Sequence, residues 1–149
     1  MTHDVNRWHS NKWPALRNSG DTIRSHSARV FALASRFFGP ILPPDVCDYI
    51  LTHDDHEVVT GDIPATAKTL WPKDLRTGFE VWEECVRREM GLPDCPDGWE
   101  RKVTFCDRLD AYQWAAKHEP RALEGDGFPE LREDLLRQAE GFGLGEVGL

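Results

Sequence analysis

The chain has 149 residues, of which 40% are hydrophobic and 30% are charged, and its formal net charge is −8. This length accommodates one domain with a substantial core, and the composition is ordinary for a globular protein in water. The acidic balance provides no basic surface for a nucleic-acid backbone, so a nucleic-acid polymer is not expected as a partner. A small anionic ligand remains open, because a few local cations or a metal can outweigh the global charge.

The cysteines and the N-terminus favour a cytoplasmic protein. None of the four cysteines forms a Cys-x-x-Cys pair, so we expect free thiols in a reducing compartment. Residues 1–13 are polar and lack the apolar segment of a secretory leader. No apolar run approaches the ~20 residues that span a bilayer, and no membrane partner is expected. The cysteines are Cys47, Cys85, Cys95 and Cys106.

Glycine, proline and capping residues divide the chain into helices and loops. Asp21 or Thr22 can cap a helix that a glycine–proline pair ends, and a second proline pair opens a helix that reaches His53 and Asp54. No strand-like alternation is present, so the predicted fold class is all-α. We expect one domain over residues 1–149, with a flexible glycine-rich tail at 141–149. The predicted helices cover residues 22–38, 44–54, 65–70, 72–90, 99–118 and 129–140, with loops at 58–64 and 92–98.

Two histidines and two aspartates, spread over most of the chain, form a candidate set of metal ligands. They are His26, the adjacent pair His53 and Asp54, and Asp107. Two imidazoles and two carboxylates suit Zn, Mn, Co or Fe. Each residue lies in a segment that is predicted to be helical, so the four side chains could converge from three helices. Asp107 lies in an apolar helix, where a lone carboxylate is costly unless it is paired or bound to a metal.

Each of these residues also has an ordinary structural explanation. A His-Asp dipeptide is most often found on a surface, and a histidine near a helix start is often a satisfied polar residue. Asp107 could pair with Arg101 or Arg108. The order His, His-Asp, Asp on successive helices is much more specific than any one member. The other histidines are interpreted as surface residues or as supports behind the site: His3, His9, His56 and His118.

Two more carboxylates follow the His-Asp pair closely. Glu57 lies four residues after His53 and three after Asp54, and in a helix both spacings place side chains on neighbouring faces. Glu57 can therefore face the same pocket as the metal ligands, and Asp62 follows in the predicted loop. With these two residues, the ligand set becomes a candidate hydrolytic site.

The pattern His…His-Asp…Asp resembles that of the HD-domain phosphohydrolases. Within that superfamily, roughly residues 7–115 look like the 5′-deoxynucleotidase family. The chain is also similar to compact phage-encoded HD enzymes that act on deoxynucleoside triphosphates, some of them on dATP, and often begin with Arg-Trp-His, as residues 7–9 do here. The segments that carry the resemblance are WPALRN from Trp13, SHS around His26, HDDHE from His53, TGDIP from Thr60 and DRLDAY from Asp107.

This resemblance implies an HD-domain helical bundle with a metal site between helices. The four ligands would bind a divalent transition metal, with Co, Mn, Zn and Fe all open. Glu57 would position or deprotonate the attacking water, or bind a second divalent ion. Asp62 would help with the water, the leaving group or the sugar.

In that family an arginine–tryptophan pair near the N-terminus recognises phosphate and sugar. Arg7-Trp8 keeps the pair but lies too far before His26 without an insertion. Lys12-Trp13 nearly keeps the spacing, but lysine is a point charge rather than a bidentate fork. Both alignments stay open, and core packing is the alternative for either tryptophan. Further candidates for binding phosphate, with solvated helix-end charge as the alternative, are Arg17, Arg24 and Lys68.

The expected function is a metal-dependent hydrolase of the 5′ phosphate linkage of a 2′-deoxynucleotide. A monophosphate would release phosphate, and a triphosphate such as dATP would release triphosphate, and the two remain equally open. The alternatives are a catalytically silent HD module that binds nucleotides and a cyclic-nucleotide phosphodiesterase. A homo-oligomer is open, and a phage-encoded protein of this kind would act in the cytoplasm of its host.

Overall fold

The computed structural model describes residues 5–10 and 12–149, and this part of the chain is all-helical, which confirms the predicted fold class. The described residues contain no sheet, only an isolated antiparallel bridge between Asn6 and Thr22. The helices are α1 (Pro14–Arg17), α2 (Ile23–Phe38), α3 (Pro44–Thr52), α4 (Glu57–Thr60), α5 (Ala65–Lys68), α6 (Lys73–Glu89), α7 (Glu100–His118), the 3-10 helix η1 (Pro120–Glu124) and α8 (Phe128–Gly141).

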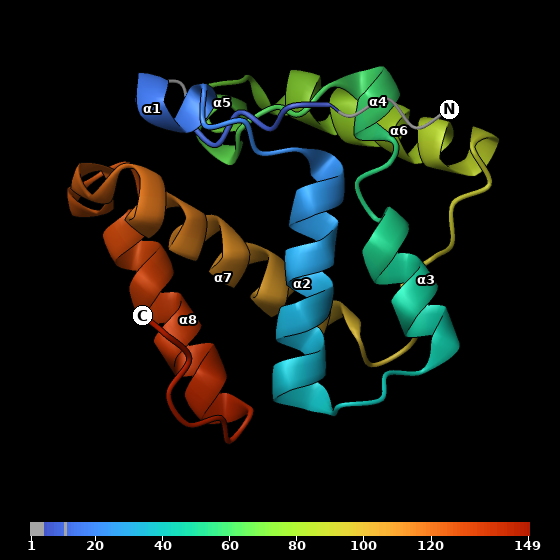
Figure 1. Cartoon of the computed structure of the whole chain (residues 1–149). Helices are drawn as coiled ribbons and strands as arrows, with labels where there is room; N and C mark the ends of the chain where they lie inside the picture. Colours follow the sequence, from blue (N-terminus) through green and yellow to red (C-terminus); the bar gives the residue numbers. More distant parts are fainter. Residues whose placement is uncertain (1–4, 11) are drawn as a thin grey trace.

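Helices α2 and α7 pack directly on each other at the centre of the bundle, with α3 on one side and α8 on the other (Figure 1). The sequence marks the start of α2 clearly, because the Thr22 side chain accepts a hydrogen bond from the backbone amide of Ser25. Its end coincides with Gly39, whose φ of 131° is in the region that favours glycine. Apolar residues of α2, such as Val30 and Ala34, are fully buried.

Helix α7 is buried along most of its length, and its buried residues do not form one narrow stripe. They include the apolar Val103, Phe105 and Leu109 but also Asp110. Phe105 is completely buried, and its ring makes edge contacts with Phe142, at a centroid distance of 5.6 Å, and with two phenylalanines of α2. A helix surrounded in this way must compensate every charge that it carries inward.

The structure corrects the predicted boundaries around the His-Asp pair. Helix α3 ends at Thr52, so His53 is its C-cap and Asp54 lies in the turn that follows, not inside a helix. The predicted loop 58–64 is wrong in its first part, because the short helix α4 covers residues up to Thr60. The short elements α1 and η1 were not predicted. Each begins with proline, but a single turn of four or five residues carries no periodic pattern.

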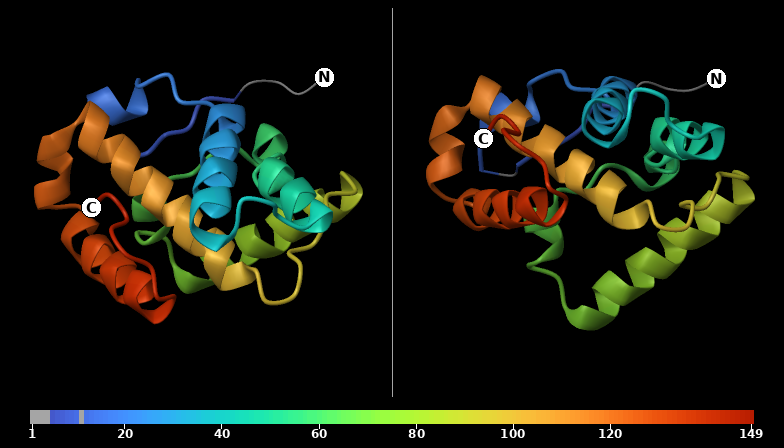
Figure 2. Two further views of the ribbon diagram at one scale, coloured as in Figure 1. Left: turned by 60° about the horizontal axis from the view of Figure 1, so that its bottom comes forward. Right: turned by 90° about the horizontal axis from the view of Figure 1, so that it is seen from below.

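Helix α6 lies apart from the other long helices (Figure 2), and none of its residues is buried. Arg87 connects it to the bundle, because its guanidinium donates to the backbone carbonyl of His53 and, at 3.0 Å, to that of Pro93. Glu83 adds a second connection, since its carboxylate accepts from Lys68 at 3.2 Å. Polar contacts rather than core packing therefore hold this helix beside the turn that carries the His-Asp pair.

The glycine-rich tail, which we expected to be flexible, folds back on α7 and α8. Val147 is 3% exposed, its carbonyl accepts from Gln113 Nε2 at 3.2 Å, and the Leu144 amide donates to the Ala139 carbonyl. Apolar residues between the glycines account for this packing. The four cysteines are unpaired. None of the helices in residues 5–10 and 12–149 is both long and apolar enough to cross a membrane.

The aromatic core around Phe105 should dominate the stability of the fold. Replacing Phe105 with Ala leaves a cavity between α2, α7 and Phe142, and we expect the free energy of unfolding to fall by about 3–5 kcal/mol. Urea unfolding followed by circular dichroism measures this change. Val81→Ala on the exposed face of α6 is the control, with an expected change below about 0.5 kcal/mol. Equal effects of the two substitutions would contradict the assignment of the core.

Candidate metal centre and adjoining cavity

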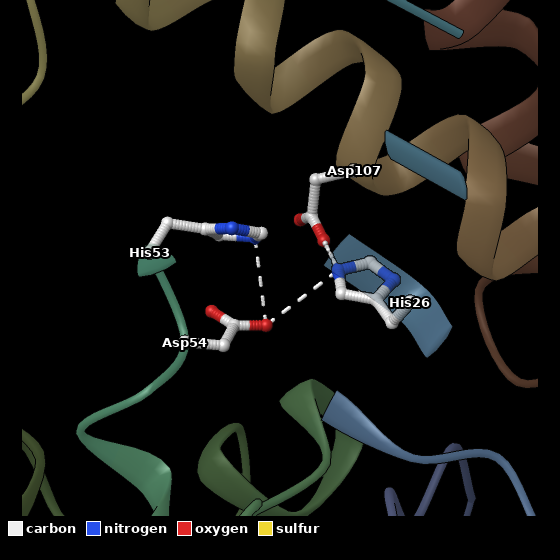
Figure 3. Close-up of side chains that lie close together, drawn as sticks. All are labelled: His26, His53, Asp54 and Asp107. Carbon is white, nitrogen blue, oxygen red and sulfur yellow. Dashed lines mark ion pairs between the residues drawn. The ribbon is translucent and has the colours of Figure 1, made fainter. Parts of the chain in front are cut away.

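The four predicted metal ligands come together in space (Figure 3). His26 comes from the first turn of α2, His53 and Asp54 from the end of α3 and the turn after it, and Asp107 from α7. One ligand atom from each residue lies within 4.8 Å of the others. His26 Nε2 is 2.9 Å from Asp107 Oδ1, and His26 Nε2 and His53 Nε2 are each 3.5 Å from Asp54 Oδ2. The predicted convergence of these residues is therefore found, although only two of them lie within helices.

Both histidines are oriented so that Nε2 faces the centre. His53 Nδ1 is 2.7 Å from the carbonyl oxygen of Ile50, which can only accept, so Nδ1 carries the proton and Nε2 presents a lone pair. His26 Nδ1 is 2.7 Å from a carboxylate oxygen of Asp110, which fixes the same tautomer. The two Nε2 atoms are buried and have no hydrogen-bond partner among the described residues.

The donor chemistry of this centre fits a divalent transition metal. Two neutral imidazole nitrogens and two carboxylate oxygens suit Zn, Mn, Co and Fe alike, so the donor set does not choose among them. Burial alone would lower the pKa of His26, but the contacts with Asp107 and Asp110 outweigh burial and raise it. A proton therefore competes with a metal for this histidine, as it does at imidazole ligands generally.

An N-terminal segment places Arg7 over the centre. The Arg7 amide donates to the Asp21 carbonyl at 2.9 Å and the Ile23 amide donates to the Val5 carbonyl at 3.0 Å, so this segment runs alongside the start of α2. The Arg7 guanidinium lies 3.9 Å from Asp54 and 4.0 Å from Asp107, and its side chain is 13% exposed. Burial alone would lower the pKa of Arg7, but these two carboxylates raise it.

The structure places the two candidate tryptophans differently. Trp8 lines the cavity beside the metal centre. Trp13 instead packs against the core and donates from Nε1 to Asp126 at 2.6 Å, and the exposed Lys12 contacts the same carboxylate. Residues 12–22, which include α1, form an excursion between Trp8 and α2.

The cavity has a volume of about 440 Å³ and adjoins the metal centre, since Asp54 and Asp107 are part of its lining. Glu57 and Asp62 line it, and Asp62 accepts a hydrogen bond from the Trp8 amide. Burial raises the pKa of Glu57 to about 9, with further contributions from Asp54 and Asp62. A bound divalent cation would act in the opposite direction and favour the carboxylate. Apolar lining is contributed by Ile63, Pro64, Ala111, Phe128 and Leu131.

The predicted cations are divided between the cavity and the outer surface. Lys68 lines the cavity, where Glu83 holds its ammonium group. Arg17 and Arg24 are exposed and are not among the cavity-lining residues. Arg108, which we did not predict, lines the cavity and donates to Asp134 at 2.7 Å.

A chain of polar side chains behind the centre was not predicted as a unit. It consists of His26, Asp110, Arg29, Asp21 and His9, and we call it the buried polar chain. His26, Asp110 and Asp21 in it are buried, and Arg29 and His9 are partly buried. Arg29 donates to Asp110 at 2.6 Å and to Asp21 at 2.7 Å, and His9 Nε2 lies 2.8 Å from Asp21. The only signal in the sequence is a second aspartate three residues after Asp107, on the same helix.

The remaining histidines occupy several environments. His9 belongs to the buried polar chain, and His56, which is 8% exposed, supports the turn with Nδ1 3.1 Å from the His53 carbonyl. His118 stacks on Trp114 at a centroid distance of 4.1 Å. His3 lies outside the described residues. Two of the four are therefore supports behind the site rather than surface residues.

Comparison with known proteins finds relatives among curated sequences. The 5′-deoxynucleotidases YfbR of Salmonella paratyphi B, Salmonella newport and Salmonella heidelberg are each 24% identical to the chain over 151 aligned positions, which cover 93% of this chain and 74% of the relative. No family model matches the chain. No solved structure matches it either. The similarity supports distant relatedness to the 5′-deoxynucleotidases, and the helical fold with its His and Asp cluster is consistent with an HD-domain bundle.

Removal of either carboxylate should destroy the metal centre. The wild-type chain should retain about one equivalent of a divalent transition metal after dialysis, whereas Asp54→Ala and Asp107→Ala should retain almost none. Elemental analysis of the purified proteins measures the content. Asp94→Ala, an exposed aspartate in the loop before α7, is the matched control and should retain the metal. Full metal content in Asp54→Ala or in Asp107→Ala would show that the replaced residue is not a ligand.

The carboxyl group of Asp21 should make stability depend on pH in the acid range. Burial alone would raise the pKa of Asp21, but hydrogen bonds from His9 and Arg29 lower it to about 2, against an ordinary value of 3.8. Because the pKa is lower in the folded state, the stabilisation is fully present above about pH 4 and is lost as the pH falls through about 2.

Asp21→Asn should therefore be less stable than the wild type near neutral pH, and the difference should shrink as the pH falls below about 4. Urea unfolding with a chelator present, repeated across this range, measures the difference at each pH. A difference that stays constant down to about pH 2 would mean that the ionised carboxylate contributes nothing.

Proposed function

We propose that the chain is a metal-dependent phosphohydrolase that hydrolyses the 5′ phosphate linkage of a 2′-deoxynucleotide. The observation that carries this proposal is the position of the four-ligand centre on the wall of a cavity that also contains Glu57, Asp62 and Arg7. The cavity volume lies within the ~300–1,000 Å³ range of small-molecule sites. The curated relatives at 24% identity, which are named 5′-deoxynucleotidases, support the choice of a deoxynucleotide.

The residues of the cavity divide the chemistry among them. A divalent metal at the four ligands would supply Lewis acidity and lower the pKa of a bound water. Glu57 has a buried carboxylate oxygen without a hydrogen-bond partner among the described residues, so it can accept the proton of the attacking water. Two buried guanidinium nitrogens of Arg7, Nε and Nη1, also have no hydrogen-bond partner among the described residues. They can donate to phosphoryl oxygens. Asp62, which accepts from the Trp8 amide, would contact the leaving group or the sugar.

The charge of the cavity favours a monophosphate over a triphosphate. Its lining contains five carboxylates and three cations. Lys68 and Arg108 pair with Glu83 and Asp134, which lie outside the lining, whereas the carboxylates nearest Arg7 are the proposed metal ligands Asp54 and Asp107. A bound metal would neutralise those two carboxylates, so Arg7 would be the main phosphate donor of the lining. A triphosphate carries more negative charge and would require more compensation than these groups supply. We therefore propose release of inorganic phosphate from a deoxynucleoside monophosphate, and the triphosphate reaction is the competing outcome.

A panel of substrates tests this proposal. The protein is incubated with each deoxynucleoside monophosphate, deoxynucleoside triphosphate, matched ribonucleotide and cyclic nucleotide in the presence of Co²⁺ or Mn²⁺. We expect inorganic phosphate from the deoxynucleoside monophosphates. Release of triphosphate would identify a triphosphohydrolase, and ring opening of a cyclic nucleotide would identify a phosphodiesterase. Nucleotide binding without any product would identify a binding module.

Glu57→Gln separates catalysis from binding in the same assay. Because the amide cannot accept the proton of water, turnover should fall by about 10²–10⁴-fold while the metal content is retained. Glu84→Gln on α6, where the side chain of Glu84 is about half exposed and pairs with Arg88, is the control and should keep wild-type turnover. Wild-type turnover in Glu57→Gln would exclude Glu57 as the general base.

A further inference from the structure

We propose that Asp110, Arg29 and Asp21 are positioning residues that link the metal ligand His26 to the N-terminal segment carrying Arg7 and Trp8. The catalytic meaning of this inference rests on the proposed function, but the contacts that carry it do not. They belong to the buried polar chain, which connects the metal centre at one end with the segment at residues 7–9 at the other. Each end has its own consequence, which can be measured separately.

At the first end, Asp110 orients the ligand His26. Its Oδ2 accepts from His26 Nδ1 at 2.7 Å, and both side chains are almost completely buried. Asp110 lies one helical turn after Asp107, so α7 supplies both a metal ligand and the carboxylate that aims a second ligand. A carboxylate behind a ligating histidine fixes its tautomer and ring orientation, and loss of such a partner typically costs 10–100-fold in metal affinity.

In the middle of the buried polar chain, Arg29 joins the carboxylates of Asp110 and Asp21. Its Nε donates to Asp110 Oδ1 at 2.6 Å, and its Nη2 lies 2.7 Å from Asp21 Oδ2 and 3.0 Å from Asp110 Oδ2. The guanidinium also lies over the Trp114 ring, 4.2 Å from its centroid. This arrangement uses the planar fork of arginine, and the single ammonium of lysine cannot reproduce it.

At the other end, Asp21 holds the N-terminal segment by two different groups. Its side chain accepts from His9 Nε2 at 2.8 Å, and its backbone carbonyl accepts from the Arg7 amide at 2.9 Å. Asp21 therefore holds the segment on both sides of Trp8. The segment is also held by the Val5 carbonyl, which accepts from the Ile23 amide, and by the Trp8 amide, which donates to Asp62. Asp21 is therefore one of several attachments that set the position of Arg7 over the centre, and it is the one that joins the segment to Arg29.

A purely structural role would give a different result from a positioning role. Buried ion networks are often replaceable without loss of stability, so stability alone does not account for their presence. If the buried polar chain only stabilised the fold, substitutions of Asp110 and Asp21 would lower the melting temperature. They would not affect the affinity for metal and the affinity for nucleotide differently. The positioning role predicts that Asp110 acts mainly on the metal and Asp21 mainly on the nucleotide.

The experiment compares Asp110→Asn with Asp21→Asn, both in the Glu57→Gln background so that turnover is slow. Metal-stripped protein is titrated with Co²⁺, and the dissociation constant and the visible d–d spectrum are recorded. The cobalt-loaded protein is then titrated with a deoxynucleoside monophosphate by calorimetry. Glu84→Gln in the same background is the control for an exposed carboxylate, and melting temperatures confirm that all variants are folded.

We expect Asp110→Asn to weaken Co²⁺ binding about 10–100-fold and to change the d–d spectrum, because Asn keeps one acceptor oxygen and its NH2 group would face a donor, either His26 Nδ1 or Arg29 Nε. Asp21→Asn should leave the Co²⁺ constant within about 3-fold and weaken nucleotide binding on the order of 10-fold. Arg29→Lys, which keeps the charge and removes the fork, should weaken both, and it serves as the second variant if Asp110→Asn fails to fold.

Equal losses in Asp110→Asn and Asp21→Asn, or an unchanged Co²⁺ constant in both Asp110→Asn and Arg29→Lys, would overturn the positioning role. The outcome is independent of hydrolysis. If the wild type hydrolyses no deoxynucleotide while the cobalt and nucleotide constants separate as expected, the proposed reaction fails and the positioning role stands.

Discussion

The constraint on which this structure depends is the presence of two carboxylates on the most enclosed helix of the bundle. Asp107 opens toward the cavity, whereas Asp110 is 2% exposed and faces the interior. An isolated ionised carboxylate in such a place would cost several kcal/mol. Burial alone would raise the pKa of each group, but the contact with His26 and the nearby arginines lower it, in Asp107 to about 2. His26 is the residue that both carboxylates share, which ties the metal centre to the core.

The same charges determine where the N-terminal segment lies. Arg7 is 3.9 Å from Asp54 and 4.0 Å from Asp107, and at about 4 Å an ion pair is worth about 4 kcal/mol if the effective dielectric constant is about 20. This attraction is comparable to the burial of a large apolar side chain. It explains how a segment with little apolar packing of its own comes to cover the site. The negative charge of the centre attracts the Arg7 guanidinium, which could also bind a phosphate.

Much of this arrangement could be predicted from the order of residue types. The order of His26, His53-Asp54 and Asp107 predicts a metal centre. Metal-ligating side chains on successive helices of a small bundle can all reach the interior between those helices. The boundaries were harder. Helix α3 ends before His53, and it is the turn after it that aims Asp54 at the centre, which periodicity alone does not reveal.

The partners of the ligands could not be predicted, for a physical reason. Asp21, Arg29 and Asp110 are common residue types at unremarkable spacings, and only the packing of α2 on α7 shows that they face one another. The choice between Arg7-Trp8 and Lys12-Trp13 was equally open, because the excursion over residues 12–22 removes any fixed relation between sequence distance and position. An exposed arginine such as Arg17 has the same appearance in a sequence as a phosphate ligand.

The charge balance of the cavity finally connects metal and substrate. Even with Glu57 protonated, four carboxylates line a space with three cations, so a phosphate entering the metal-free cavity would meet net repulsion. A divalent cation at the four ligands would neutralise the carboxylates that Arg7 now compensates. The guanidinium, with Nε and Nη1 unpaired within the described chain, would then be available to a phosphate. Binding of a metal and binding of an anion would therefore favour each other in this cavity, since both involve the same pair of carboxylates.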